Sequence, residues 1–112
     1  MKNSPPFKIR KFQPFRNQAR TMLGFLNIET PSGIVLYGCK LMIGMKGTVF
    51  VSMPAIKRVD DDGRPVLDDR GKPVWDSVVD FRNREARDKF NDGVLDAVRS
   101  QYPDAFAELE RL

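Results

Sequence analysis

The alternation of apolar and polar residues predicts several β-strands in the first half of the chain. Over residues 7–12, apolar residues alternate with Lys and Arg, which is the period of a half-exposed strand. After a turn at 13–18, three more apolar, β-prone stretches follow, separated by turn sequences, at residues 21–29, 34–43 and 48–53. Pro54 ends the fourth stretch, because proline has no N–H to donate to a neighbouring strand. A last strand is predicted at residues 75–81.

The period of the pattern changes from two residues to a helical repeat after residue 81. Asn83 has a side chain suited to cap a helix N-terminus. Apolar residues then recur on one helical face, at Ala86, Phe90, Val94, Leu95 and Val98. We expect this helix to run to about Tyr102, before Pro103, and a short second helix to occupy residues 103–112. The prediction is an α+β fold, in which an antiparallel sheet of four to five strands is followed by a C-terminal helix and a short second helix.

A single domain is predicted over residues 7–102, preceded by a disordered N-terminus at residues 1–6. Within this domain, residues 56–74 contain a near-repeat eight residues apart, with Gly, a basic residue, Pro and Val in each copy. Two successive turns are the simplest explanation, so the segment is expected to form an extended loop or hairpin arm. Its five aspartates lack the spacing and the closing Glu of a calcium-binding loop, so no metal or other cofactor is expected.

Charge is divided unevenly along the chain. Residues 1–58 carry ten Lys and Arg against one acid, whereas residues 59–112 carry nine against fourteen acids. A basic sheet offers a polyanion a continuous surface, so nucleic acid is the expected partner, DNA more than RNA, and no small-molecule substrate is expected. The predicted contacts form three clusters, in or beside the first strand, at the start of the arm and around the helix start: Lys8, Arg10 and Lys11; Lys57 and Arg58; Arg82, Arg84, Arg87 and Lys89. We expect the three clusters to converge on one surface.

The composition disfavours an enzyme and a secreted or membrane protein. The chain has no histidine, which removes the usual base of nucleophilic triads and the commonest metal ligand. Its single cysteine, Cys39, lies in an apolar stretch and is expected to be a small buried residue. The N-terminal residues lack the apolar core of a signal peptide, and no run approaches the ~20 residues of a membrane span. We therefore expect a cytoplasmic protein without enzymatic activity or membrane contact.

Two segments resemble a known protein family. Residues 49–57 read VFVSMPAIK and resemble the F-V-[AS]-M-P-x-x-[KR] segment of the stage V sporulation protein G (SpoVG) family. The predicted helix resembles that family's N-x-x-x-R-x-K-x-x-D-x-V-L-x-A run, at Asn83, Arg87, Lys89, Asp92, Val94, Leu95 and Ala97. The resemblance covers residues 7–100 and implies a small, dimeric, bacterial DNA-binding regulator, with Arg87 and Lys89 as the strongest contact candidates. The chain departs from the family in its longer Asp/Gly/Pro arm and at residues 78–81, where members usually carry a His-Pro pair.

Two alternatives to a DNA-binding regulator remain open. A single-strand-binding or recombination accessory protein would use the sheet face and stack aromatic side chains on bases, with Phe12, Phe15 and Tyr37 as candidates. A protein-interaction module would use the acidic second half to engage a basic partner. A homodimer is expected in addition, because the apolar stretches at 34–43 and 49–51 exceed what one short helix covers.

Overall fold

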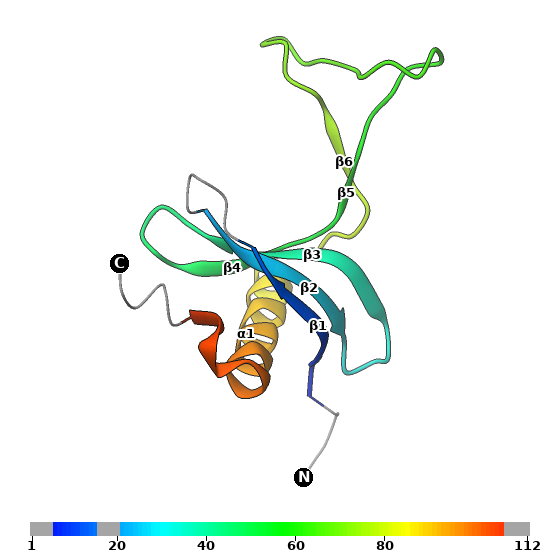
Figure 1. Ribbon diagram of the computed structural model, residues 1–112. Helices are drawn as coiled ribbons and strands as arrows, with labels where there is room; N and C mark the ends of the chain where they lie inside the picture. Colours follow the sequence, from blue (N-terminus) through cyan, green and yellow to red (C-terminus); the bar gives the residue numbers. More distant parts are fainter. Residues whose placement is uncertain (1–5, 16–20, 107–112) are drawn as a thin grey trace.

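The computed structural model describes residues 6–15 and 21–106, and shows an antiparallel sheet with a helix packed across one of its faces (Figure 1). The sheet has four strands in the order β1-β2-β3-β4, and a separate two-stranded sheet, β5-β6, belongs to an arm that projects from the main body. The elements are β1 (Lys8–Pro14), β2 (Met22–Glu29), β3 (Val35–Ile43), β4 (Val49–Ser52), β5 (Ala55–Lys57), β6 (Trp75–Ser77), the helix α1 (Arg84–Gln101) and the 3-10 turn η1 (Pro103–Phe106). The predicted α+β fold is confirmed.

The strand register gives the sheet one face toward α1 and one face away from it. Residues paired across strands share a face, and Ile9, Ile28 and Leu36 form one row on the helix side. Buried residues of this row and its neighbours meet α1 and η1 in a core that consists of Ile9, Leu23, Leu26, Ile28, Cys39, Leu41, Val51, Val94, Ala97, Val98 and Phe106. None of the described elements packs on the opposite side, which we term the open face.

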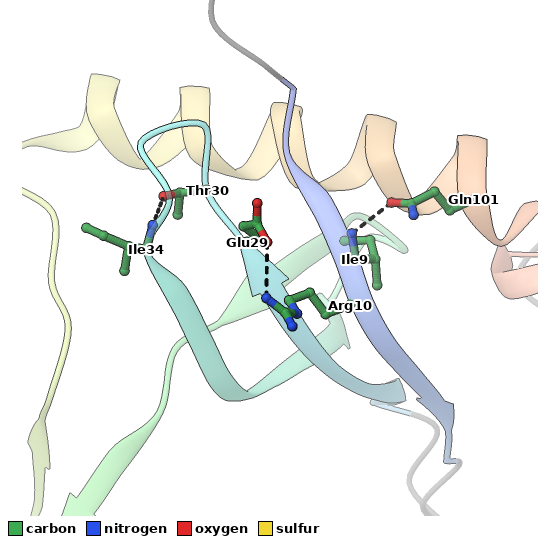
Figure 2. Close-up of polar contacts among 6 residues, drawn as sticks. All are labelled: Ile9, Arg10, Glu29, Thr30, Ile34 and Gln101. Carbon is green, nitrogen blue, oxygen red and sulfur yellow. Dashed lines mark hydrogen bonds and ion pairs between the residues drawn. The ribbon is translucent and has the colours of Figure 1, made fainter.

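Two amide side chains of α1 hold the helix to the two edge strands of the sheet. Asn91 Oδ1 accepts a hydrogen bond from the backbone N–H of Val51 in β4, at 3.1 Å. Gln101 Oε1 accepts one from the N–H of Ile9 in β1, at 2.7 Å (Figure 2). The outward N–H groups of an edge strand have no partner within the sheet and offer a template for pairing with another chain. The helix therefore covers one sheet face and also satisfies a donor at each edge.

The ends of α1 are set by local sequence. Asn83 is the N-cap, and its Oδ1 accepts a hydrogen bond from the N–H of Ala86 at 2.9 Å, which confirms the predicted cap. At the other end the N–H of Tyr102 donates to the carbonyl of Val98 at 2.7 Å, and Pro103 then begins η1. Within the described residues, no helix combines the length and the apolar character that crossing a membrane requires.

The arm, residues 55–77, folds through the eight-residue near-repeat. Asp60 Oδ1 accepts hydrogen bonds from the backbone N–H groups two and four residues ahead, and Asp68 Oδ1 does the same in the second copy, at 2.8 to 3.0 Å. Gly63 and Gly71 occupy equivalent positions with φ of 80° and 79°, a conformation that residues with a side chain rarely adopt. The predicted pair of successive turns is confirmed.

Three residues spaced by eight close the arm into a three-part junction. The backbone N–H of Arg58 donates a hydrogen bond to the carbonyl of Val74 at 2.9 Å, and the N–H of Val74 donates to the carbonyl of Val66 at 2.9 Å. The N–H of Val66 donates to the carbonyl of Arg58 at 3.0 Å, which closes the ring. The cross-strand pairs around this ring are equivalent by the repeat: Val59 with Pro65, Leu67 with Pro73, and Lys57 with Trp75. An isolated two-stranded hairpin is marginally stable in water, so the closed ring of backbone hydrogen bonds gives the arm internal support.

Some predicted boundaries differ from the structure. The last strand ends at Ser77 rather than at residue 81 and pairs with β5 in the arm, because Phe81 turns to α1 and packs on Phe90, with ring centroids 5.2 Å apart. The first strand continues through Pro14, since an edge strand tolerates a residue without an N–H. The predicted second helix is a 3-10 turn over its first four residues. The rest of it, the remainder of the turn at 13–18 and the predicted disorder at 1–5 lie outside the described residues.

Replacing Asn91 with Ala is expected to lower the free energy of unfolding by about 1–3 kcal/mol, because the N–H of the buried Val51 loses its partner. Asp92→Ala is the matched control, since Asp92 is exposed and its replacement brings a similar gain in helix propensity without touching the sheet. Urea unfolding followed by circular dichroism measures both variants. Equal stabilities would show that the edge bond contributes nothing.

Candidate nucleic-acid interface

The open face is built from the residues of each strand that point away from α1. Three of its rows follow from the register, namely Gln13, Phe25, Lys40 and Ser52; Lys8, Glu29 and Val35; and Met22, Met42 and Phe50, of which Met22 is buried. Lys11 lies opposite Asn27 in a further row. Basic, polar and aromatic side chains therefore stand on this face beside the apolar Val35, Met22 and Met42, whereas the rows that meet α1 are mainly aliphatic.

A β-bulge adds basic charge to the open face in β1. Ile9 pairs with Ile28 and Lys11 pairs with Asn27, so Arg10 is an extra residue on its strand. A bulge redirects a side chain relative to strict alternation. Arg10 accordingly lies on the side of the sheet away from α1, where its guanidinium donates to Glu29 at 3.2 Å (Figure 2).

The open face carries an excess of positive charge. Its exposed cations are Lys8, Arg10, Lys11 and Lys40, against the carboxylate of Glu29. Among residues 6–15 and 21–106, Lys8, Lys11 and Lys40 form no ion pair. The one pair on this face joins two partly exposed groups, and such surface pairs contribute little to stability. The cations therefore remain available to an anionic partner.

Aromatic rings lie among these cations. Tyr37 directly follows Leu36, whose side chain packs against the core, so the alternation along β3 places Tyr37 on the open face, where it is 65% exposed. Phe50 is 39% exposed. Phe25 is half-buried, and its ring centroid lies 5.5 Å from that of the exposed Phe15 at the end of β1. Phe12 lies instead on the helix side, 5.3 Å from the ring of Tyr102. Of the three aromatic residues predicted to stack on bases, Phe12 therefore belongs to the core.

The basic residues at the helix start lie in a different layer from the open face. Arg84, Arg87 and Lys89 project from the first turns of α1, and Arg82 precedes them; all four are exposed. Lys89 is 3.6 Å from Glu85, whereas the three arginines form no ion pair within the described part of the chain. Because α1 packs on the covered face of the sheet, the start of α1 lies behind the sheet relative to the open face (Figure 1). The helix-start cluster and the β1 cluster therefore belong to different layers of the fold.

The arm cluster is engaged in contacts within the arm. Arg58 makes two hydrogen bonds to the carboxylate of Asp76, at 2.6 and 3.1 Å. The hydrogen bond from Arg58 lowers the pKa of Asp76 and raises that of the guanidinium, so both groups are charged at neutral pH. Lys57 Nζ lies 5.2 Å from the ring centroid of Trp75, within the range of a cation–π interaction. These contacts stabilise the arm and leave less charge free for a ligand.

Three residues of the open face escaped the sequence-based selection. Lys40 interrupts the apolar stretch at residues 34–43, and this polar position was the available signal that one face of the strand is exposed to solvent. Phe25 and Phe50 occur in segments where nearly every residue is apolar, so period alone does not show which side each faces. The register supplies that information.

Cys39 is fully buried among core residues, as expected, and its Sγ lies 4.0 Å from the sulfur of Met53. Burial raises the pKa of the Cys39 thiol to about 11. The residue is thus a packed apolar side chain rather than a nucleophile. Within residues 6–15 and 21–106, no group of three or more potential ligands comes together to hold a metal ion.

Cys39 is expected to resist alkylation by a maleimide at pH 8 in the folded protein, because its thiol is both buried and protonated there. Mass spectrometry over time, with and without denaturant, measures the reaction. Rapid modification of the native protein would contradict the buried position.

The free energy of unfolding is expected to fall as the pH rises from about 9 toward about 11, because the folded state keeps the Cys39 thiol neutral while the unfolded chain lets it ionise.

Comparison of the chain with protein-family models, with curated proteins and with solved structures finds no match. The resemblance to the SpoVG family therefore stays a prediction from two short motifs. Some of the motif residues have structural roles here, since Asn83 caps α1 while Val94 and Ala97 are buried in the core. Arg87 and Lys89 are exposed and have no structural role of this kind.

Proposed function

We propose that this protein binds single-stranded nucleic acid through the open face of its sheet. The observation that carries the proposal is one uncovered face with exposed cations and aromatic rings interspersed: Lys8, Arg10, Lys11 and Lys40; Phe25, Tyr37 and Phe50. Single-strand binders combine a basic track for the phosphates with aromatic rings on which the bases stack. The unpaired bases of a single strand are free to reach such rings, whereas duplex bases are already stacked inside the helix.

The order of side chains across the strands supports this proposal. Phe25 in β2 lies directly opposite Lys40 in β3, whereas Phe50 in β4 lies diagonally from Lys40, because Lys40 pairs with Ser52 and Phe50 pairs with Met42. Neighbouring strands are about 4.8 Å apart and a strand rises about 3.4 Å per residue, so the two aromatic positions, two strands and two residues apart, are separated by roughly 12 Å. A nucleic-acid strand that crosses the sheet obliquely from β2 to β4 would pass the Phe25 ring, Lys40 and then the Phe50 ring. The open edge of this track is β1, where Lys11 and the bulged Arg10 add further charge.

The second candidate is a duplex-DNA-binding regulator that uses the start of α1, as the SpoVG resemblance implies. It is favoured by the exposed Arg82, Arg84 and Arg87, which form no ion pair in the described residues and adjoin the positive end of the helix dipole. Arg87 and Lys89 are two residues apart, roughly 200° around a helix, so one phosphate backbone reaches both only by crossing near the helix end. The two candidates are distinguished by which cluster sets the salt dependence of binding.

The double variant Lys11→Ala/Lys40→Ala is expected to bind a single-stranded oligonucleotide more weakly than the parent. Its log–log salt slope should fall by about 0.7 for each phosphate that the variant no longer neutralises. Arg87→Ala/Lys89→Ala is the matched control, since it removes the same number of exposed cations from the other layer. Fluorescence anisotropy at several salt concentrations, with single-stranded and duplex DNA and with RNA, measures the slopes. If the control loses binding and the open-face variant does not, the helix start is the site, with a slope change of about 0.9 per duplex phosphate.

Removing a ring from the open face should weaken single-strand binding without changing the salt slope, because stacking releases no counterions. Tyr37→Ala is expected to cost about 1–3 kcal/mol of binding free energy if one base stacks on it. Tyr37→Phe keeps the ring and should bind as the parent does. The same anisotropy titration measures both variants, and equal affinities for the two would remove Tyr37 from the site.

A further inference from the structure

The arm carries an apolar surface that the proposed nucleic-acid site does not use. Of the ten exposed large hydrophobic side chains in the described residues, four lie in the arm, at Ile56, Val59, Leu67 and Trp75. The last three are 55% to 57% exposed, and each directly follows a residue that closes the hydrogen-bonded ring. Because these positions are equivalent by the eight-residue repeat and side chains alternate along an extended chain, all three lie on one face of the junction.

Two prolines extend this apolar face. Pro65 pairs with Val59, and Pro73 pairs with Leu67; residues directly opposite in antiparallel pairs share a face. We name the surface formed by Val59, Pro65, Leu67, Pro73 and Trp75 the junction face. All five residues are exposed, and Lys57, opposite Trp75, lies at the edge of the same face with its Nζ 5.2 Å from the Trp75 ring centroid. Clustered exposed apolar side chains are typical of surfaces that contact another molecule.

The charge of the arm does not suit a polyanion. Residues 55–77 contain five basic and six acidic residues, in contrast to the cationic open face. Acidic and basic residues both occur at the turns that surround the junction face, with Asp62 near Arg64 in one turn and Asp69 next to Arg70 in the other. A surface with an apolar centre and both signs at its rim is self-complementary, because a twofold axis can bring an acid of one copy to a base of the other.

Other surfaces of the described residues are less suited to contact a second copy. At the edge of β4, which has four residues, the N–H of Val51 is bound to Asn91. The edge of β1 contains a bulge and Pro14, and the N–H of Ile9 is bound to Gln101. Bulges, prolines and short edge strands all disfavour pairing between sheets. Two open faces brought together would oppose like charges.

We infer that two copies of this chain associate through their junction faces. An isologous contact of this kind buries Trp75, Leu67 and Val59 of both copies around a twofold axis. It leaves both open faces free and does not depend on their binding nucleic acid.

Trp75 is an intrinsic fluorescence probe of the junction face, because it is the single tryptophan of the chain. Sedimentation equilibrium and Trp75 emission are measured over the same range of protein concentration, without nucleic acid. The parent should reach twice the 12.8 kDa chain mass, and its emission should shift to shorter wavelength as the dimer forms. Val59→Ser/Leu67→Ser should raise the dimer dissociation constant by at least ~10-fold, as expected for central apolar contacts. Ile34→Ser/Met45→Ser, which removes exposed apolar side chains outside the arm, should dimerise as the parent does.

Circular dichroism and a second variant distinguish a misfolded arm from a weakened interface. The second variant is Leu67→Glu, which places like charges across the twofold axis. The inference is overturned if the parent stays monomeric with an emission independent of concentration, or if both arm variants dimerise like the parent. It is also overturned if Trp75 responds to an oligonucleotide in a monomeric protein and the arm variants lose nucleic-acid affinity, since the arm would then be a nucleic-acid contact.

Discussion

The docking of one helix across one face of a four-stranded sheet determines which surfaces of this protein are free. Val94 and Val98 are fully buried against the sheet, and the amides of Asn91 and Gln101 bind the outward N–H groups of Val51 and Ile9 at the two edges. Apolar burial provides the attraction, whereas the two amide contacts fix the position of the helix between the edges. One helix has only enough apolar surface for one side of the sheet. The other side is left to solvent or to a ligand.

The different chemical character of the three surfaces follows from this arrangement. The open face combines cations with rings, the helix start is a separate basic cluster behind the sheet, and the arm is apolar at its centre with mixed charges at its turns. Tied edges reduce the tendency of the sheet to pair with another chain, so the self-association that we infer concerns the arm rather than the strands. A dimer formed through the arms presents two open faces, and two modest sites on one assembly bind a single long strand more tightly than either site alone.

Local signals in the sequence predicted much of the fold, and non-local contacts account for what was missed. The cap at Asn83 and the twin turns of the arm both depend on residues close together in sequence. The faces of the strands were harder to predict, because bulges at Arg10 and near Gly38 interrupt the alternation and decide that Phe12 is a core residue while Tyr37 is exposed. The charge pattern identified the basic first strand as a candidate, but it could not show that the helix start lies on the other side. The ring that closes the arm joins residues eight and sixteen apart, which composition does not reveal.

Chemical-shift mapping tests most directly whether nucleic acid lies on the open face. Backbone amide spectra of nitrogen-15-labelled protein are recorded during titration with a single-stranded oligonucleotide at low salt. We expect the largest shifts around Lys11, Phe25, Lys40 and Phe50, with the start of α1 and the turns of the arm little changed. Shifts concentrated at residues 82–89, with an unperturbed sheet, would contradict the claim.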